Sequence, residues 1–407
     1  MNVKPSNFRC LYCDKEKPIC ESTLEHGIPQ FLGGKYAPKI FEFKNVCGWC
    51  NSTLGRHVDA SFARSWFVSA AIQNNAMTCY DAKTRQFPIP LMCMGITSHK
   101  PPNILDEVCE SWVGPLGEQI FLIRKHDEKI YWYVGGDPIK PKQTQSSRAY
   151  FFFSERSHLA PQITWDSFKE AYSNEKTKKI MCTEVRGADP SLIGFSSPDD
   201  LDSKRIGYFK QATSIKRGYQ KNSLPINVDF DHRFLCKLAL AVAYGLFGED
   251  FLASKYAEEL RKGIWHRPDA NVDFDEIECN TPLINGLSSL EFGDEKLNKI
   301  LFTKGSVVIL IMQVAQGFAM QLMIGERSFG CIKIADSQLV TPEIMQNFGN
   351  GVVFIFYKFL KRSLSMPLPS YLAHKLGNVA NQELHELENN ISNNDGYFRN
   401  LKLSNSI

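Results

Sequence analysis

Four cysteines form two Cys-x2-Cys pairs, Cys10 with Cys13 and Cys47 with Cys50. Structural zinc takes four nitrogen or sulfur ligands in a closed tetrahedron, and each such pair supplies two thiolates with suitable geometry. The alternatives are buried core thiols or a disulfide framework. The first residues contain no apolar run typical of a secretory signal, so we expect a cytoplasmic protein with reduced thiols. We therefore predict a structural zinc site at these four cysteines.

Three residues near these pairs could carry chemistry. Glu25 and His26 lie between the pairs, and Asn51 directly follows the last cysteine. An imidazole titrates near neutral pH and can deprotonate a water molecule, while a carboxylate and an amide oxygen can hold a hard divalent cation beside a phosphate. Neighbouring strand residues point to opposite faces, so Glu25 and His26 can serve one site only where the strand is bulged, bent or ends. We predict such a distortion.

The segment around these residues has the pattern of a ββα unit. Residues 22–29 are predicted to form a strand that ends at Pro29, and Gly33–Gly34 supply a turn. Residues 39–44 are the second predicted strand. Apolar residues recur at three- and four-residue steps over residues 51–71, which predicts a helix. A unit this small buries little apolar surface, so zinc has a structural reason to be present.

These residues and their order resemble the HNH, or ββα-metal, endonuclease family, in its four-cysteine, zinc-stapled branch. The resemblance covers about residues 8–70. It implies that His26 is the general base and that Asn45 pins the loop and orients this histidine. It also implies that Glu25 and Asn51 hold a catalytic metal, so that the family's three marker positions read His-Asn-Asn here.

The last marker position departs from the family name. Asparagine in place of histidine at Asn51 makes the ligand set harder and favours Mg²⁺ or Mn²⁺ over zinc. The arrangement is also similar to that of phage recombination endonucleases that resolve branched DNA, in which a carboxylate and an asparagine hold the metal. One helical turn after Asn51 stands Gly55, so the second helix-borne ligand of some relatives is absent.

Basic residues follow on the same predicted helix. Arg56, His57 and Arg64 are candidate contacts for the phosphates of a nucleic-acid backbone. The alternative is a solvated helix face, which is the commoner role of charged helical residues.

Composition limits the class of protein. The chain has 407 residues, of which 43% are hydrophobic, and a formal net charge of +3. It is therefore not a strongly basic DNA-coating protein, and affinity for nucleic acid must come from local patches. The longest apolar stretch, residues 307–324, is interrupted by glutamines and a glycine. This pattern predicts two strands around a turn and no membrane span.

We predict an α+β protein in four parts. The expected parts are a zinc-stapled ββα-metal module over residues 1–80, a mixed α+β region over 81–225, a region over 226–390 and a polar tail over 391–407. Within 226–390 we expect a helical hairpin followed by a C-terminal antiparallel sheet. The hairpin pattern spans residues 230–247 and about 251–262, with Gly248 as a C-cap. The β-rich segments are residues 306–312, 318–324, 330–335 and 352–357.

Two functions from different classes fit the sequence. The resemblance implies a metal-dependent endonuclease that acts on DNA, with RNA left open as a substrate, and the small module joined to a large body suits a restriction or anti-phage defence effector. The alternative is a zinc-stabilised nucleic-acid-binding module that does not cleave. Binding alone would require none of His26, Glu25, Asn45 and Asn51. We also expect a homodimer if both strands are cut, and a regulatory partner or trigger that acts through the larger region.

Overall fold

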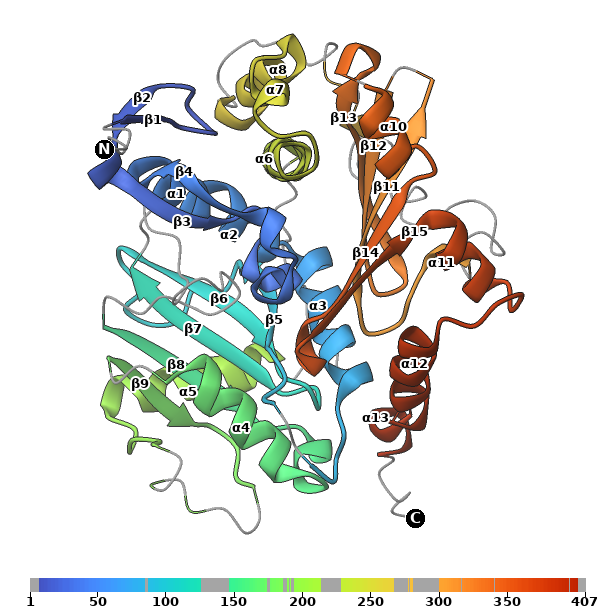
Figure 1. Ribbon diagram of the computed structural model, residues 1–407. Helices are drawn as coiled ribbons and strands as arrows, with labels where there is room; N and C mark the ends of the chain where they lie inside the picture. Colours follow the sequence, from blue (N-terminus) through green and yellow to red (C-terminus); the bar gives the residue numbers. More distant parts are fainter. Residues whose placement is uncertain are drawn as a thin grey trace. The chain divides into compact units, whose positions relative to one another are not determined.

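The computed structural model divides the chain into two compact units, which are described separately (Figure 1). Unit 1 contains Met1–Phe62 and Asn227–Asn393, and unit 2 contains Ala63–Ile226 and Asn394–Ile407. The structure describes residues 7–84, 87–125, 146–173, 176–185, 189, 191, 194–213, 228–266, 277, 279–280, 300–315, 317–339, 341–394 and 396–401. The grouping differs from the expected one, in which a module over residues 1–80 is separate from the region over 226–390.

The N-terminal part of unit 1 is the predicted ββα fold. Strand β3 (Ser22–His26) pairs antiparallel with β4 (Glu42–Cys47), and α1 (Gly48–Leu54) follows directly. The chain continues through a π-helical turn, η5 (Gly55–Asp59), into the short helix α2 (Ala60–Ala63). A small antiparallel hairpin of β1 (Asn7–Arg9) and β2 (Glu16–Pro18) precedes this fold, and its turn carries the first cysteine pair.

Local hydrogen bonds shorten the predicted elements. The first strand ends at His26, and the second begins only at Glu42 because η4 (Lys39–Phe41) is a 3-10 turn closed by the N–H of Phe41 to the Pro38 carbonyl at 3.0 Å. The helix predicted over residues 51–71 is interrupted. A new helix, α3 (Trp66–Cys79), begins where the hydroxyl of Ser65 accepts from the N–H of Val68 at 3.5 Å.

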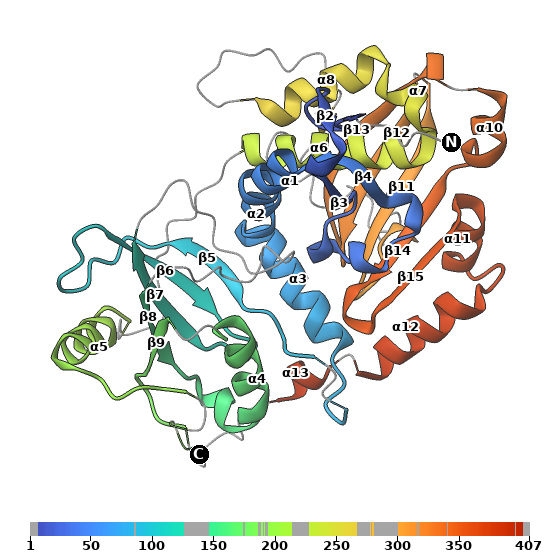
Figure 2. The ribbon, with the colours of Figure 1, turned by 60° about the vertical axis from the view of Figure 1, so that its left-hand side comes forward.

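The helical hairpin is present in unit 1. Helix α6 (Val228–Phe247) ends at Gly248, whose φ of 73° is the left-handed conformation that glycine accepts without strain. A single turn, α7 (Glu249–Leu252), comes next. Helix α8 (Lys255–Trp265) then begins at a serine cap and packs against α6. In Figure 2, α6 lies between the ββα fold and the large sheet of the same unit.

The large sheet of unit 1 is antiparallel, as predicted. Its described strands follow the order β10-β13-β12-β11-β14-β15. Their bounds are β10 (Cys279–Asn280), β11 (Val307–Val314), β12 (Gly317–Ile324), β13 (Arg327–Asp336), β14 (Val352–Tyr357) and β15 (Arg362–Pro367). The long apolar stretch is therefore two paired strands. Among the described residues, no helix is long and apolar enough to span a membrane.

Aromatic rings join the ββα fold to α6 and the sheet. Phe62 stacks on Phe234 of α6, with ring centroids 3.9 Å apart and 5° between the planes. Phe31 contacts the same Phe234 ring at 5.7 Å, and Phe41 meets Phe354 of β14 edge-on at 5.1 Å. These contacts explain why residues up to Phe62 group with the C-terminal region, because rings of the small fold pack against rings of that region.

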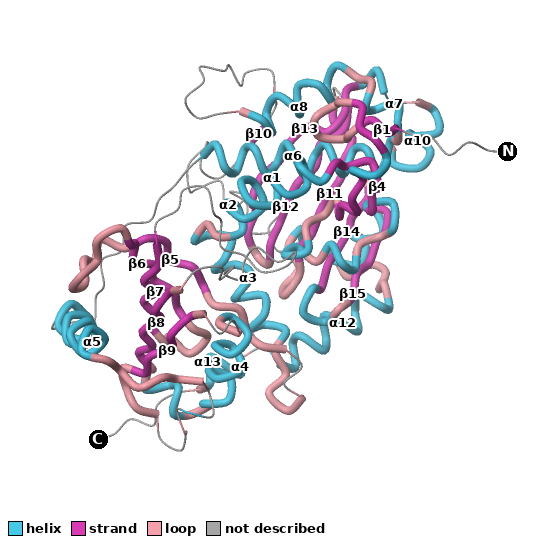
Figure 3. The backbone as a smooth tube through the Cα atoms, turned by 90° about the vertical axis from the view of Figure 1, so that its left-hand side faces the viewer, coloured by secondary structure: helices cyan, strands magenta, loops and turns pink. Residues whose placement is uncertain are grey.

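Unit 2 contains the mixed α+β region. Its described strands form one sheet in the order β5-β6-β7-β8-β9, with only β8 and β9 parallel. Their bounds are β5 (Met92–Ile96), β6 (Glu107–Val113), β7 (Gln119–Lys125), β8 (Ser147–Phe152) and β9 (Thr177–Met181). Helices α4 (Pro161–Ala171) and α5 (Asp200–Thr213) pack on opposite faces, through the Phe151–Phe168 and Phe121–Phe209 ring pairs (Figure 3).

The segment predicted as a polar tail is partly helical. After η9 (Ser337–Leu339) and α10 (Pro342–Phe348), the C-terminal helices are α11 (Leu368–Lys375), α12 (Gln382–Asn394) and α13 (Tyr397–Asn400). Phe398 of α13 is buried against Tyr80 in unit 2, with centroids 5.5 Å apart. The described part of the expected tail, residues 391–394 and 396–401, therefore contains two buried apolar side chains, Ile391 and Phe398. The final residues lie outside the described part.

Phe234→Ala tests the packing of α6 on the ββα fold. We expect the unfolding free energy of unit 1 to fall by about 3–5 kcal/mol, because the lost ring leaves a cavity beside Phe62 and Phe31. Chemical denaturation measures this change. Leu376→Ala is the control, because Leu376 is 56% exposed. It should shift stability by less than about 0.5 kcal/mol. A Phe234→Ala effect as small as that of the control would contradict the packing.

Candidate functional site

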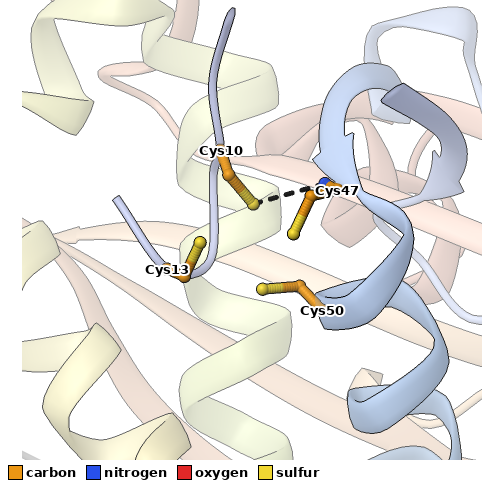
Figure 4. A group of neighbouring side chains, drawn as sticks. All are labelled: Cys10, Cys13, Cys47 and Cys50. Atoms are coloured by element: carbon orange, nitrogen blue, oxygen red, sulfur yellow. Dashed lines mark hydrogen bonds between the residues drawn. The ribbon is translucent and has the colours of Figure 1, made fainter. Parts of the chain in front are cut away.

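The four cysteines converge on one point in unit 1 (Figure 4). Their sulfur atoms all lie within 4.8 Å of one another. Cys10 and Cys13 come from the turn between β1 and β2, Cys47 ends β4, and Cys50 is in the first turn of α1. A hydrogen bond with Cys10 and burial both raise the pKa of the Cys50 thiol, so thiolates crowded here need a cation to offset their charge. The donor set fits tetrahedral zinc.

Residues from α8 hold the first cysteine turn in place. Arg261 donates from Nε to the carbonyl of Leu11 at 3.0 Å and pairs with Asp14 at 3.3 Å. The N–H of Leu11 in turn donates to the carbonyl of Asn45 at 2.8 Å. The turn that carries Cys10 and Cys13 is therefore held by a helix that is distant in the sequence, since Arg261 and Leu11 are 250 positions apart.

Strand β3 ends at His26, one of the distortions predicted there, and its pairing with β4 is irregular just before that point. Thr23 pairs with Val46 and Glu25 pairs with Phe43, so that two residues of β4 lie opposite Leu24 alone. This is a β-bulge whose extra residue lies in β4.

Asn51 fixes the bulge from α1. Its amide Nδ2 donates to Thr23 Oγ1 and to the carbonyl of Leu24, both at 3.1 Å. The amide nitrogen is therefore committed to β3, which leaves the amide oxygen to accept other groups. Asn51 therefore pins α1 to β3, in addition to its predicted role as a metal ligand.

Asn45 belongs to the frame of the zinc cluster. Its carbonyl accepts from the N–H of Leu11, and its side chain lowers the pKa of the Tyr244 phenol on α6, against the larger effect of burial. The Tyr244 hydroxyl donates to Glu249 at 2.8 Å. These contacts assign Asn45 a scaffolding position, and its predicted role in orienting His26 stays a prediction.

His26 is half-buried at the end of β3, where it pairs with Glu42. Its Nδ1 atom is buried, and the described residues offer it no hydrogen-bond partner. A ring nitrogen in this state is unusual in a folded protein and is a feature of sites that bind or transfer a proton.

Glu25 is buried and already has partners. Tyr12 donates its hydroxyl to Glu25 Oε1 at 2.9 Å, and the Lys237 ammonium lies 3.1 Å from the same oxygen. The same ammonium pairs with Asp59 Oδ2 at 2.6 Å. Burial lowers the pKa of Lys237, but the two carboxylates outweigh this effect and raise it, so the lysine is charged. Burial raises the pKa of Asp59, against the opposing effect of Lys237.

In this arrangement Glu25 is not free to bind a divalent metal ion, because it already pairs with Lys237. The carboxylate is held in an ion pair, and among the described residues the four cysteines are the one group of three or more His, Cys, Asp and Glu side chains close enough to hold a metal. The amide oxygen of Asn51 remains a suitable hard ligand.

The three residues predicted to contact phosphates do not lie in one place: Arg56 and His57 are in unit 1, whereas Arg64 is in unit 2. Arg56 is exposed on η5, and His57 is half-buried beside it. Burial, Arg233 and Arg56 together lower the pKa of His57. Arg64 does not fit the prediction, because its guanidinium is buried in unit 2 and pairs with Glu110 at 3.0 Å.

Glu110 binds two guanidinium groups in unit 2. Burial alone would raise its pKa, but Arg64 and Arg124 lower it to about 2, so the carboxylate is charged. Arg64 is therefore a structural cation.

An exposed aromatic pair lies beside the zinc cluster. Trp49 is 62% exposed and stacks on Trp265 of α8, with centroids 5.2 Å apart and 18° between the planes. The indole N–H of Trp265 donates to the carbonyl of Tyr12 at 2.9 Å, and this bond fixes the Trp265 ring beneath Trp49.

The sequence alone does not assign a site role to Tyr12, Asp59, Lys237 or the tryptophan pair. One of them, Lys237, does carry a sequence signal, because it stands between Phe234 and Ala241 on the apolar face of its helix. A lysine at three- and four-residue spacing from core residues indicates a buried charge with a partner.

Cys13→Ser tests the zinc assignment. We expect the variant to lose its zinc and the unfolding temperature of unit 1 to fall, because three thiolates close the tetrahedron poorly. Metal analysis and thermal unfolding measure both changes. Cys20→Ser is the matched control, since Cys20 is exposed in the same fold and should keep full zinc content. Unchanged zinc and unfolding in Cys13→Ser would disprove the assignment.

Comparison with protein families assigns the segment that contains this site. The family model for HNH endonuclease matches residues 10–67. Comparison with curated proteins and with solved structures gave no match. The matched segment begins at the first zinc-site cysteine and includes β3, β4 and α1. Residues 10–67 of this chain therefore match the HNH endonuclease family, and they contain a four-cysteine cluster compatible with structural zinc.

Proposed function

We propose that this protein is an endonuclease that hydrolyses phosphodiester bonds in DNA, with His26 as its general base. The observation that carries this proposal is the place of His26 within a segment that matches HNH endonucleases. The residue ends β3 just after a bulge in the partner strand β4, is half-buried, and has a ring nitrogen without a partner among the described residues.

The proposed chemistry begins with a proton transfer to His26. The imidazole takes a proton from water as the water oxygen attacks phosphorus, and the bond from phosphorus to the 3′ oxygen breaks. The leaving oxygen takes a proton from solvent. Asn51 supports this step by holding β3 against α1, since its two hydrogen bonds lie at the bulge just before the histidine.

Nuclease chemistry of this kind is assisted by a divalent cation, which stabilises the charge of the phosphate when bound. We propose Mg²⁺ or Mn²⁺, because Asn51 offers an amide oxygen and Glu25 a carboxylate, both hard ligands. The ion pair of Glu25 with Lys237 opposes this assignment in the arrangement described.

The exposed surface of α1 and the following η5 is the proposed contact for nucleic acid. Trp49 of α1 and Arg56 of η5 are both exposed. The nearby Arg233 and His57 add basic groups, and aromatic rings beside cations bind nucleotides by stacking and by phosphate contact. DNA is the proposed substrate, and RNA would use the same stacking and charge.

One observation favours a second function. Because the Glu25 carboxylate is paired with an internal cation, a non-cleaving, zinc-stabilised nucleic-acid-binding module is the alternative. A restriction or anti-phage role, a cytoplasmic location, a homodimer and a regulatory partner remain expectations of the proposed nuclease, drawn from the small HNH module in a large chain.

His26→Ala tests the proposed nuclease. Conversion of supercoiled plasmid is measured with Mg²⁺, Mn²⁺ or EDTA, and zinc content is checked in each protein. We expect metal-dependent cleavage by the wild type and a loss of about 10²–10⁴-fold in the variant, because the general base is removed. His158→Ala replaces an exposed histidine of unit 2 and should cleave normally. Equal cleavage by His26→Ala would exclude this role, and no cleavage by any protein would favour the binding module.

Trp49→Ala tests the proposed contact with nucleic acid. In the His26→Ala background, we expect the Kd for a labelled single-stranded oligonucleotide to rise by roughly 5- to 150-fold, the effect of losing about 1–3 kcal/mol of stacking. Fluorescence anisotropy gives the Kd. Ile40→Ala is the control, because Ile40 is 48% exposed in the same fold and should bind normally. Equal binding by Trp49→Ala and the control would place the contact elsewhere.

A further inference from the structure

The most unusual group in unit 1 is a fully enclosed lysine. The side chain of Lys237 is 4% exposed, and its ammonium lies between Glu25 and Asp59 at 3.1 and 2.6 Å. Both carboxylates belong to the segment that matches HNH endonucleases, whereas the lysine comes from α6. The larger part of the chain therefore supplies a cation to the carboxylate that the sequence analysis identifies as a metal ligand.

We propose that Lys237 is an internal cation that competes with a divalent metal for Glu25, so that metal binds Glu25 only when Lys237 withdraws. This inference rests on the proposed function, because it concerns the metal of the same HNH site. It makes α6 a control element for metal loading.

The charges around Lys237 support this competition. Two carboxylates surround one ammonium, and the second oxygen of Asp59 is buried with no hydrogen-bond partner among the described residues. The cluster thus has one more carboxylate than cations. A divalent ion placed at Glu25 beside the ammonium would meet like-charge repulsion in a poorly solvated interior. With the ammonium gone, the same carboxylates would be hard oxygen ligands.

Stability alone does not account for the lysine. A buried ion pair generally stabilises a fold no better than apolar side chains of the same volume. Lys237 stands in an apolar face between Phe234 and Ala241, where a leucine or methionine would pack. Its ammonium is also held over the ring of Tyr12, 5.6 Å from the centroid, and Tyr12 itself donates to Glu25. The tyrosine and the lysine therefore bind the same carboxylate.

Binding of Mn²⁺ alone, without nucleic acid, tests the competition. Zinc-loaded full-length proteins are titrated with Mn²⁺ and followed by electron paramagnetic resonance. We expect Lys237→Met to bind Mn²⁺ at least about tenfold more tightly than the wild type, with the gain lost in Lys237→Met/Glu25→Gln. Lys333→Met is the matched control, because Lys333 is 9% exposed and pairs with Asp336 at 2.7 Å. It should bind Mn²⁺ like the wild type.

Two results would overturn the proposal. These are equal Mn²⁺ affinity in Lys237→Met and the wild type, and a gain in Lys237→Met that survives Glu25→Gln. If Lys237→Met fails to fold, Lys237→Gln repeats the test, because glutamine can donate to the carboxylates without carrying a charge. The Mn²⁺ titration measures binding and not cleavage. It can therefore contradict the proposed competition while the plasmid assay with His26→Ala still supports the nuclease.

Discussion

A single ammonium group buried between two carboxylates joins the two sequence segments of unit 1. Lys237 of α6 contacts Glu25 at the end of β3 and Asp59 at the end of η5, so it ties both sides of the ββα fold to the C-terminal region. Removing one partner of such a buried group typically costs about 3–5 kcal/mol, because the remaining charge is left without compensation. The contact therefore constrains both the packing of the fold and the chemistry open to Glu25.

The four-cysteine cluster and α8 complete the same frame from the other side. The four thiols hold the β1–β2 turn to the start of α1, and Arg261 and Trp265 of α8 bind the backbone of that turn. The HNH segment is thus not a free-standing domain, because its core rings, its cysteine turn and its acidic residue are all completed by residues after position 226. This dependence offers a physical route by which the larger region could influence the small one.

Features set by local pattern could be predicted from the sequence. Two Cys-x2-Cys pairs sufficed for the thiol cluster, because ligand spacing is a local property. The helix ending at Gly248 and the paired strands of residues 307–324 follow from periodicity and turn chemistry. The bulge before His26 followed from the need for adjacent residues to share one site, and the structure contains it.

Features set by distant partners could not be predicted. No local signal pairs Glu25 with a lysine more than 200 positions later, or shows that the first segment of unit 1 ends at Phe62. Arg64 was read as a surface residue because its partner Glu110 lies in another strand. Distant partners also decide the contacts of Asn51 and Asn45, since the Asn51 amide donates to Thr23 and the Asn45 carbonyl accepts from Leu11.

The central claim is that Glu25 cannot serve Lys237 and a divalent metal at the same time. The most direct measurement is a pair of crystal structures of the zinc-loaded protein, one without and one with Mn²⁺, in which anomalous scattering locates the manganese. The account predicts Lys237 between Glu25 and Asp59 in the first structure. In the second, it predicts either no manganese at Glu25 or manganese at Glu25 with Lys237 moved away. Manganese bound to Glu25 while Lys237 keeps both ion pairs would contradict it.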